Sequence, residues 1–250
     1  MIRPLFKEYK SKSYLASWII QHFPLNYEEF GYLEPYVRGG SIFLNKAQSI
    51  SPLGEAINDI DEGVTQIYRA IRDEPEVFTG RLRHIKYCEK TFIKNLKNSI
   101  FKDYMDHAVR EFVLRRMSQG GRKRAFAPDD IQSWNNIILK LPEVIKRMKN
   151  VYVFNKPVLE TIAAYDNDKV LMFVNPPLLA DLVDVKENEL STNEHIKLWE
   201  MLNQFRGKVI ISALPSVLYK RLYHSDHGWR CIWKKTKVKN VNMDCIWCNY

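Results

Sequence analysis

Three short segments of this 250-residue chain place side-chain oxygens and glycines directly after apolar runs. Amide and carboxylate oxygens accept hydrogen bonds, and a glycine lets the backbone approach a ligand where a Cβ would intrude. In open α/β sheets, ligands bind beyond the carboxyl ends of the strands, so these segments predict one ligand-binding edge. The segments are EPYVRGG (34–40), NDID (58–61) and NPP (175–177).

A basic cluster around Gly120-Gly121 could bind phosphate groups. The chain carries 38 Lys and Arg against 29 Asp and Glu, a formal charge of +9, which favours polyanionic partners. Phosphate contacts of this kind supply affinity and not sequence readout. A solvated basic loop is the alternative. The cluster consists of Arg115, Arg116, Arg122, Lys123 and Arg124.

A second basic group lies near the C-terminus. Its members, Lys234, Lys235, Lys237 and Lys239, fall in a predicted hairpin, where lysines often serve only to block edge-to-edge aggregation.

The elements that position these segments alternate between strands and helices. Apolar spacing predicts a helix over 12–23 that Pro24 ends, then a short strand at Tyr32-Leu33. We expect a helix after Gly39-Gly40 that carries Ile42, Phe43 and Leu44. A strand ending at Asn58-Asp59 and a helix with Val64, Ile67, Tyr68 and Ile71 on one face follow. Two such strand-loop-helix units predict a parallel sheet with right-handed crossovers.

The second half of the chain resumes the sheet after a helical insert. From about 75 to 147 the pattern is helical and basic, interrupted by SQGGRKRAFAPDD. Apolar runs at 151–155, 170–177 and 207–213 predict buried strands, a cap signal at Ser191-Thr192 begins a helix, and the tail predicts two antiparallel edge strands. We therefore predict a Rossmann-like α/β domain, 1–74 and 148–250, with an inserted basic helical subdomain at 75–147.

Composition excludes several classes of protein. With 46% hydrophobic residues the chain is no disordered tail, and four cysteines are too few for a disulfide miniprotein. No apolar run approaches the roughly 20 residues of a membrane-spanning helix, and MIRPLFKEYKSKS lacks the apolar stretch of a signal peptide. We expect a cytoplasmic protein with reduced thiols and no membrane partner.

The order and spacing of EPYVRGG, NDID and NPP, followed by HIKLWEMLN and GKVIIS, resemble the Dam-like adenine-specific DNA methyltransferases over essentially the whole chain. In that family a K-Y-x-G-G-K element, an E-P-F-x-G-G-G loop and an N-D turn build the S-adenosylmethionine pocket. A D-P-P-Y loop holds a flipped adenine, and a helical insert containing R-M-S-x-G-G contacts DNA, which VLRRMSQGGRKRAFAPDD matches closely.

The resemblance implies a role for each matching residue. The expected cofactor-binding residues are Lys12, Tyr36, Arg38, Gly39, Gly40 and Asp59. The expected catalytic loop is Asn175, Pro176, Pro177 and Leu178, and the basic cluster 115–124 is expected to bind double-stranded DNA. It also implies that the closing strand DCIWCNY simply faces the core, so we predict no metal site, although His224, His227, Cys231, Cys245 and Cys248 could chelate zinc.

Several motifs depart from the family pattern. Lys10 and Ser11 replace two glycines, Arg38 replaces the first glycine of the loop, and Leu178 replaces the tyrosine. Pro157-Val158 stands where an acid and an aromatic grip the cofactor adenine. Lost base stacking costs roughly 1–3 kcal/mol and a lost charged acceptor roughly 1.5–3 kcal/mol. The combined loss is on the order of 5 kcal/mol, thousands-fold in binding.

These departures predict a DNA-binding homologue in which S-adenosylmethionine binding and methyl transfer are impaired or absent. Its expected partners are double-stranded DNA and an active methyltransferase or a restriction-related protein. One alternative is an active adenine DNA methyltransferase in which Asn175 takes the role of the aspartate. Another is an enzyme whose reshaped cleft holds a different anionic ligand through Arg38 and Lys10.

Overall fold

Seven strands form one mixed sheet in the order β3-β2-β1-β4-β5-β7-β6. The computed structural model describes residues 1–7, 12–98, 100–180, 189–238 and 241–250. The strands are β1 (Gly31–Glu34), β2 (Glu55–Asn58), β3 (Val151–Phe154), β4 (Val170–Val174), β5 (Lys208–Ala213), β6 (Arg230–Val238) and β7 (Val241–Cys248). The predicted α/β class, with a Rossmann-like sheet and a C-terminal antiparallel hairpin, is confirmed.

Helices precede the first strand and lie between most of the others along the chain. They are α1 (Ala16–Ile20), α2 (Glu62–Asp73), α3 (Pro75–Arg83), α4 (Glu89–Lys97), α5 (Tyr104–Met117), α6 (Ile131–Arg147), α7 (Val158–Ala164), α8 (Thr192–Gln204) and α9 (Val217–Leu222). Short 3-10 turns lie at Ser13–Leu15, Tyr27–Glu29, Gln119–Gly121, Pro128–Asp130 and Ser225–His227. Within the described residues, no helix has the length and apolar character needed to cross a membrane.

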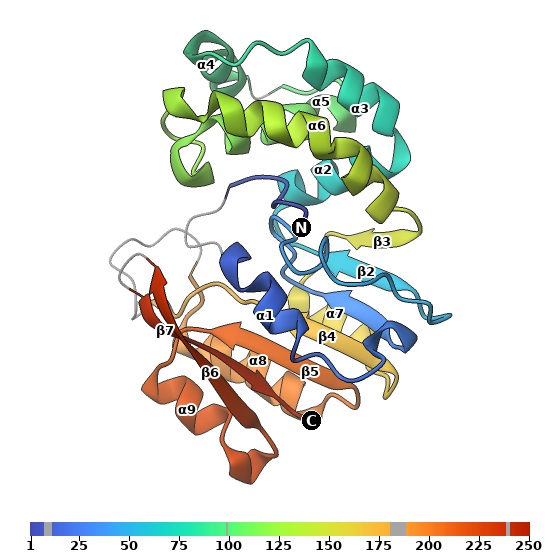
Figure 1. The fold of residues 1–250 in the computed structure, drawn as a ribbon, viewed down its shortest axis with the longest axis vertical. Coiled ribbons are helices and arrows are strands. Elements are labelled where there is room, and N and C mark those ends of the chain that lie inside the picture. The colour runs from blue at the N-terminus through green and yellow to red at the C-terminus, as the bar shows by residue number, and fades with distance from the viewer. Residues whose placement is uncertain (8–11, 99, 181–188, 239–240) are drawn as a thin grey trace. The chain divides into compact units, whose positions relative to one another are not determined.

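Backbone contacts divide the chain into two units. Unit 1 comprises residues 1–21, 37–48 and 59–155, and unit 2 comprises 22–36, 49–58 and 156–250 (Figure 1). The helical insert therefore shares its unit with α2 and with the N-terminal residues. The predicted domain boundaries at 74/75 and 147/148 stay a prediction.

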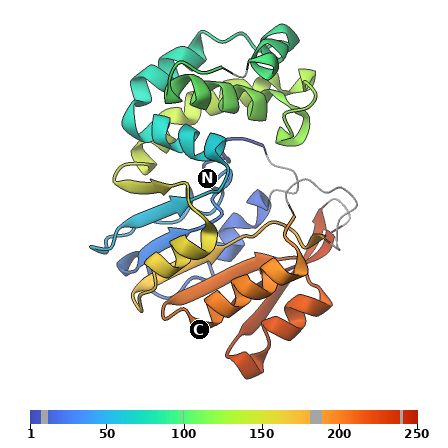
Figure 2. The ribbon, with the colours of Figure 1, turned by 180° about the vertical axis from the view of Figure 1, so that it is seen from behind.

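Unit 2 contains the parallel strands that set the functional edge. β1 pairs in parallel with both β2 and β4, and β4 pairs in parallel with β5, while β7 runs antiparallel to β5 and β6. All five residues of β4 are buried, because helices cover a parallel sheet on its faces. Figure 2 shows α7 and α8 side by side on one face of these strands. A capping box between Ser191 and Glu194 begins α8, as the sequence predicts.

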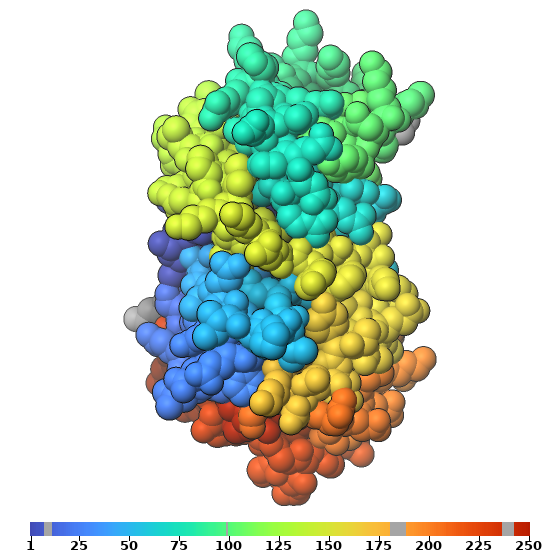
Figure 3. Space-filling view, turned by 90° about the vertical axis from the view of Figure 1, so that its right-hand side faces the viewer, coloured from blue at the N-terminus to red at the C-terminus, as the bar shows by residue number. Residues whose placement is uncertain are grey.

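Unit 1 holds a helical core of its own. Phe112 of α5 contacts Phe78 of α3 and Trp134 of α6, with ring centroids 5.6 and 5.8 Å apart, and all three rings are buried. The space-filling view shows α3 and α6 lying beside each other on one face of this unit (Figure 3). The expectation that 75–147 is mainly helical is confirmed.

The predicted helix at 42–44 is wrong. Residues 41–46 form successive turns, in which the Leu44 amide donates to the Gly40 carbonyl at 2.9 Å. Arg38 and Gly40 both have positive φ angles, 48° and 71°, which start the segment in a left-handed conformation that does not lead into a regular helix. Phe43 and Leu44 are nevertheless buried, so the apolar pattern reflects burial and not helix. The predicted helix over 12–23 is shorter than expected, at Ala16–Ile20.

Candidate functional site

The turn after β1 lies in unit 1 from Val37 onward and is held by α2. Arg38 adopts φ +48°, and its carbonyl accepts a hydrogen bond from the Tyr68 hydroxyl at 2.9 Å. Gly40 has φ +71°, and a Cβ at this position would lie 2.5 Å from the same hydroxyl. The Gly39 carbonyl accepts from the Leu5 amide at 3.1 Å. The positive φ and the contact with Tyr68 therefore both require glycine at position 40.

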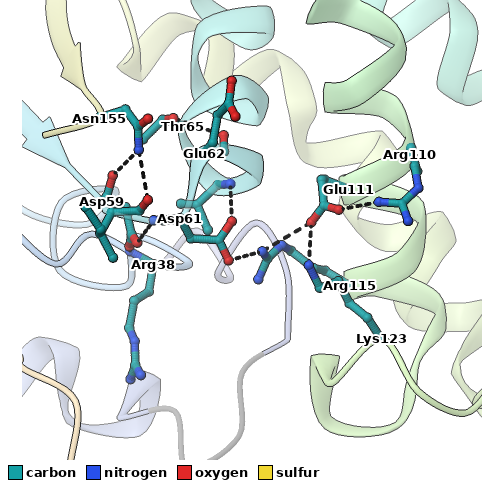
Figure 4. Close-up of polar contacts among 12 residues, drawn as sticks. Arg38, Asp59, Asp61, Glu62, Thr65, Arg110, Glu111, Arg115, Lys123 and Asn155 are labelled. Carbon is teal, nitrogen blue, oxygen red and sulfur yellow. Dashed lines mark hydrogen bonds and ion pairs between the residues drawn. The ribbon is translucent and has the colours of Figure 1, made fainter. Parts of the chain in front are cut away.

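Asp59 holds the backbone of this turn. Its carboxylate accepts from the Arg38 amide at 2.9 Å and from the Asp61 amide at 3.0 Å, one bond to each oxygen. Burial raises the pKa of Asp59, and the two backbone amides oppose that rise. Asn155 donates to the carbonyls of Asp59 and Ile60 at 2.8 and 3.0 Å, as Figure 4 shows. The Arg38 guanidinium points away from the Asp59 carboxylate (Figure 4).

Asp61 begins α2 and joins it to α5. Its carboxylate accepts from the Val64 amide at 3.3 Å, which makes it the N-cap, and from the Arg115 guanidinium at 2.5 Å. Partial burial raises the pKa of Asp61, but the Arg115 cation outweighs burial, so the pKa lies below its usual range. The Asp61 carboxylate thus makes two contacts. It caps the N-terminus of α2, and it pairs with Arg115 of α5.

In unit 2, Asn58 ties together the loops at the carboxyl edge of the sheet. The fully buried amide donates to the carbonyls of Pro35 and Lys156 at 3.1 and 3.2 Å and accepts from the Lys156 amide at 3.0 Å. Tyr36 follows Pro35 and is half-buried. All of these Asn58 bonds are internal, so its role in the structure is to set loop conformation.

The segment Asn175 to Leu178 leaves β4 at that same edge, because β1 and β4 are parallel. Pro176 is buried, whereas Asn175, Pro177 and Leu178 are half-buried. The Leu178 carbonyl accepts from the Leu190 amide at 3.1 Å, which fixes the end of the loop. In α8, the buried His195 ring forms a hydrogen bond with the Tyr219 hydroxyl through Nδ1 at 3.0 Å.

A family model for D12 class N6 adenine-specific DNA methyltransferases matches residues 11–240. That span is most of the chain. The chain belongs to this family.

Individual relatives of this D12 chain are distant. It is 24% identical over 181 residues to the type II methyltransferase M1.LlaDCHI of Lactococcus lactis subsp. cremoris, across 70% of this chain and 58% of that protein. The chain thus spans just over half the length of this curated relative.

Two solved structures are similar at low identity. One is a precorrin-6y C5,15-methyltransferase from Geobacter metallireducens GS-15, with a TM-score of 0.42, 11% identity and coverage of 97% of this chain and 91% of the other. The second is the rRNA methyltransferase aviRa from Streptomyces viridochromogenes, with a TM-score of 0.41, 10% identity and coverage of 99% and 87%.

Arg115 and Arg116, the helical residues of the predicted DNA-binding cluster of this D12 chain, make internal contacts. Arg115 pairs with Asp61 and lies 3.2 Å from a Glu111 carboxylate oxygen. Arg116 is buried and donates to the Ser133 carbonyl and hydroxyl at 2.6 and 2.8 Å, and burial lowers its pKa to about 10. Their predicted contact with DNA stays a prediction.

The other three lie on the loop 118–127, which folds back on itself. An isolated bridge joins Ser118 to Phe126, and the Ser118 hydroxyl accepts from the Lys123 amide at 2.9 Å. The Lys123 ammonium contacts Glu111 at 2.9 Å, while Arg122 is half-buried and Arg124 exposed. The loop therefore has a defined conformation that presents basic side chains.

The remaining predicted positions are scattered over both units. Lys12 is half-buried before the turn at Ser13–Leu15, and the predictions for Lys10 and Ser11 lie outside the described residues. Pro157, in place of the expected acid, is the N-cap of α7, with its carbonyl accepting from the Thr161 amide at 3.1 Å. None of the four cysteines forms a disulfide, and the described residues contain no group of three or more His, Cys, Asp or Glu side chains suited to a metal ion.

Sequence reasoning did not identify the polar contacts of Asp61, Tyr68 and Glu111. The acid before an apolar helix pattern could have identified Asp61 as a cap. Glu111 stands four residues before Arg115, a spacing that pairs side chains on a helix. The contacts that these three residues make with other segments of the chain carry no signal in the sequence.

Proposed function

We propose that this chain is a DNA-binding homologue of D12 adenine methyltransferases in which methyl transfer is impaired. The distribution of charge carries the DNA-binding part of the proposal. Unit 1 contains 25 Lys and Arg against 14 Asp and Glu, a net +11, whereas unit 2 contains 13 against 15, a net −2. The positive excess of the chain therefore belongs to the unit that contains the insert, where DNA phosphates would be bound.

The backbone of the turn fits S-adenosylmethionine better than the hydrogen-bond acceptors around it do. The backbone of the Arg38–Gly40 turn retains left-handed angles and a glycine cradle against Tyr68. The acceptors fit less well, because both oxygens of the Asp59 carboxylate hold backbone amides and the residue is buried, which leaves only part of its accepting capacity for a ribose hydroxyl. Pro157 offers no carboxylate, and Arg38 adds a cation beside a cofactor whose sulfonium is itself cationic. These features support weak cofactor binding.

The loop at 175–178 supports the same conclusion for the flipped base. Asn175 keeps an amide oxygen that can accept from an exocyclic amine. Leu178 gives apolar contact without an aromatic face, and stacking on an aromatic is worth roughly 1–3 kcal/mol per base. A flipped adenine at this loop would lose part of the stacking free energy that offsets the cost of extruding the base from the duplex.

Titration of labelled duplex DNA by fluorescence anisotropy at several salt concentrations tests the binding part. We expect a linear fall in the logarithm of the association constant with the logarithm of salt concentration, at a slope of about −0.9 for each phosphate neutralised. Absent or salt-insensitive binding would contradict this part.

Transfer of labelled methyl groups to adenine tests the catalytic part. We expect little transfer by the unchanged chain and more by the Leu178→Tyr variant, which restores a stacking surface. Efficient transfer by the unchanged chain that disappears in Asn175→Ala would instead favour an active enzyme. A partner role toward an active methyltransferase or a restriction-related protein is part of the proposal and is tested by co-sedimentation with such proteins.

A further inference from the structure

Glu111 is a buried carboxylate surrounded by three cations. Its side chain is 4% exposed. Arg110 contacts Oε1 at 2.7 Å, whereas Lys123 and Arg115 contact Oε2 at 2.9 and 3.2 Å, as Figure 4 shows. Three converging cations around one anion are the arrangement by which proteins bind a phosphate group.

The first turn of α2 lies against the same carboxylate. A Cβ built on Gly63 would lie 2.5 to 2.7 Å from the Glu111 carboxyl group and its γ-carbon. The N-terminal turn of a helix favours negative charge, because its amides are unpaired and its dipole is positive there. Glu111 thus occupies a place built for an anion, and only glycine at position 63 leaves room for it.

Lys123 is the cation of this group that can leave. It belongs to the loop 118–127 and is 35% exposed, whereas Arg115 is 11% exposed and also bonds Asp61. If Lys123 turned to solvent, Arg110 and Arg115 would still neutralise Glu111. The more exposed Lys123 ammonium is therefore held by an internal carboxylate, which the two guanidiniums would keep paired in its absence.

We propose that Glu111 competes with DNA phosphate for Lys123, so that binding of a phosphate group transfers the Lys123 ammonium from the carboxylate to the DNA. This inference rests on the proposed DNA-binding function and assigns its regulation to one contact. Each encounter with DNA must break the Glu111–Lys123 pair, which lowers the affinity of the free chain for DNA.

Anisotropy titrations of duplex DNA with Glu111→Gln test the competition. We expect the affinity for DNA to rise roughly threefold to tenfold at low salt, because Lys123 no longer has to leave an ion pair with Glu111 before it contacts a phosphate. The matched control is Glu143→Gln, which changes the net charge equally and removes an exposed partner of Lys140 in the same unit. Equal gains in the two variants would show a general charge effect and would overturn the proposal.

Lys123→Gln provides a second test that does not disturb the buried carboxylate. We expect its salt slope to become shallower by about 0.9, one phosphate contact, and Glu111→Gln/Lys123→Gln to lose the gain of the single Glu111 variant. An unchanged slope would show that Lys123 only supports the loop and would contradict the transfer. This test also decides the matter if Glu111→Gln fails to fold by circular dichroism.

The outcomes also separate the inference from the proposed function. Binding by Glu111→Gln but not by the unchanged chain supports the competition in its strongest form. DNA binding by the unchanged chain with no difference between Glu111→Gln and Glu143→Gln retains the proposed function and rejects the inference. If neither chain binds, both fail.

Discussion

At the residue scale, Arg38 shows that a backbone path and a side chain can be decoupled. The position keeps the left-handed φ of a glycine turn while carrying a guanidinium that extends away from Asp59. A non-glycine residue in this conformation costs roughly 1–2 kcal/mol, which Asp59 and Tyr68 offset by bonding its amide and carbonyl.

Replacing Arg38 distinguishes the two effects. We expect Arg38→Ala and Arg38→Gly to tighten S-adenosylmethionine binding to a similar degree, on the order of tenfold, because both remove the cation. Only Arg38→Gly also removes the conformational strain, so it should be the more stable of the two. Calorimetric titration and chemical denaturation measure these effects, and a gain seen with glycine alone would assign the obstruction to the backbone.

Replacing either of two glycines by alanine should change the free energy of unfolding, in opposite directions. Gly40→Ala places a Cβ 2.5 Å from the Tyr68 hydroxyl at positive φ, so we expect a loss of about 2 kcal/mol in the free energy of unfolding. Gly80→Ala, inside α3 with no heavy atom within 4 Å of the new Cβ, should gain about 0.5–1 kcal/mol. Urea denaturation compares them, and a neutral Gly40→Ala would show that the turn relaxes.

At the scale of elements, Asp61 connects the N-terminus of α2 to α5. Because its pKa is lower in the folded chain than in the unfolded one, its contribution to stability is complete above the ordinary carboxyl pKa of 3.8. The contribution falls as pH drops through the folded pKa. The ion pair with Arg115 and the cap to Val64 are separable, because asparagine can still cap.

We expect Asp61→Asn to lose about 1 kcal/mol at pH 7 and Asp61→Ala to lose roughly a further 1 kcal/mol, the value of a cap. The difference between Asp61→Asn and the unchanged chain should shrink as pH falls below 3.8, where the unchanged carboxyl becomes protonated. Thermal unfolding across this pH range measures it. A constant difference at all pH values would mean that the ion pair contributes nothing.

At the scale of the whole molecule, charge is distributed unevenly between the units. The net charges of +11 in unit 1 and −2 in unit 2 predict that DNA affinity depends on where a cation is removed. Two pairs of basic residues allow a comparison at equal change in net charge, one in the insert loop and one in the β6 strand of unit 2.

We expect Arg122→Gln/Arg124→Gln to weaken DNA binding at least tenfold and to make the salt slope shallower by up to about 1.8, because two phosphate contacts are lost. Lys234→Gln/Lys235→Gln should change affinity less than threefold, as edge-strand lysines that mainly prevent aggregation would. Salt-dependent anisotropy titrations compare the two. Similar losses would indicate that unit 2 also contacts DNA.

The sequence by itself determined the fold class, the strand order along the chain and the positions of the loops that follow β1, β2 and β4. Strands that are buried on both faces are continuous apolar runs, so the sequence shows where they lie. Because a parallel sheet brings the carboxyl ends of its strands to one edge, the sequence also shows which loops lie at that edge. The departures at Arg38, Pro157 and Leu178 are equally visible in the sequence.

Only the tertiary structure decided which basic residues have internal partners. Arg115, Arg116 and Lys123 read as one exposed cluster in the sequence, yet they contact Asp61, Ser133 and Glu111 respectively. The turns at 41–46 likewise replaced a predicted helix, because the conformations of Arg38 and Gly40 are stabilised by Asp59 and Tyr68 from distant parts of the chain. Periodicity records which residues are buried, whereas ion pairs and backbone bonds between elements depend on packing that no local pattern encodes.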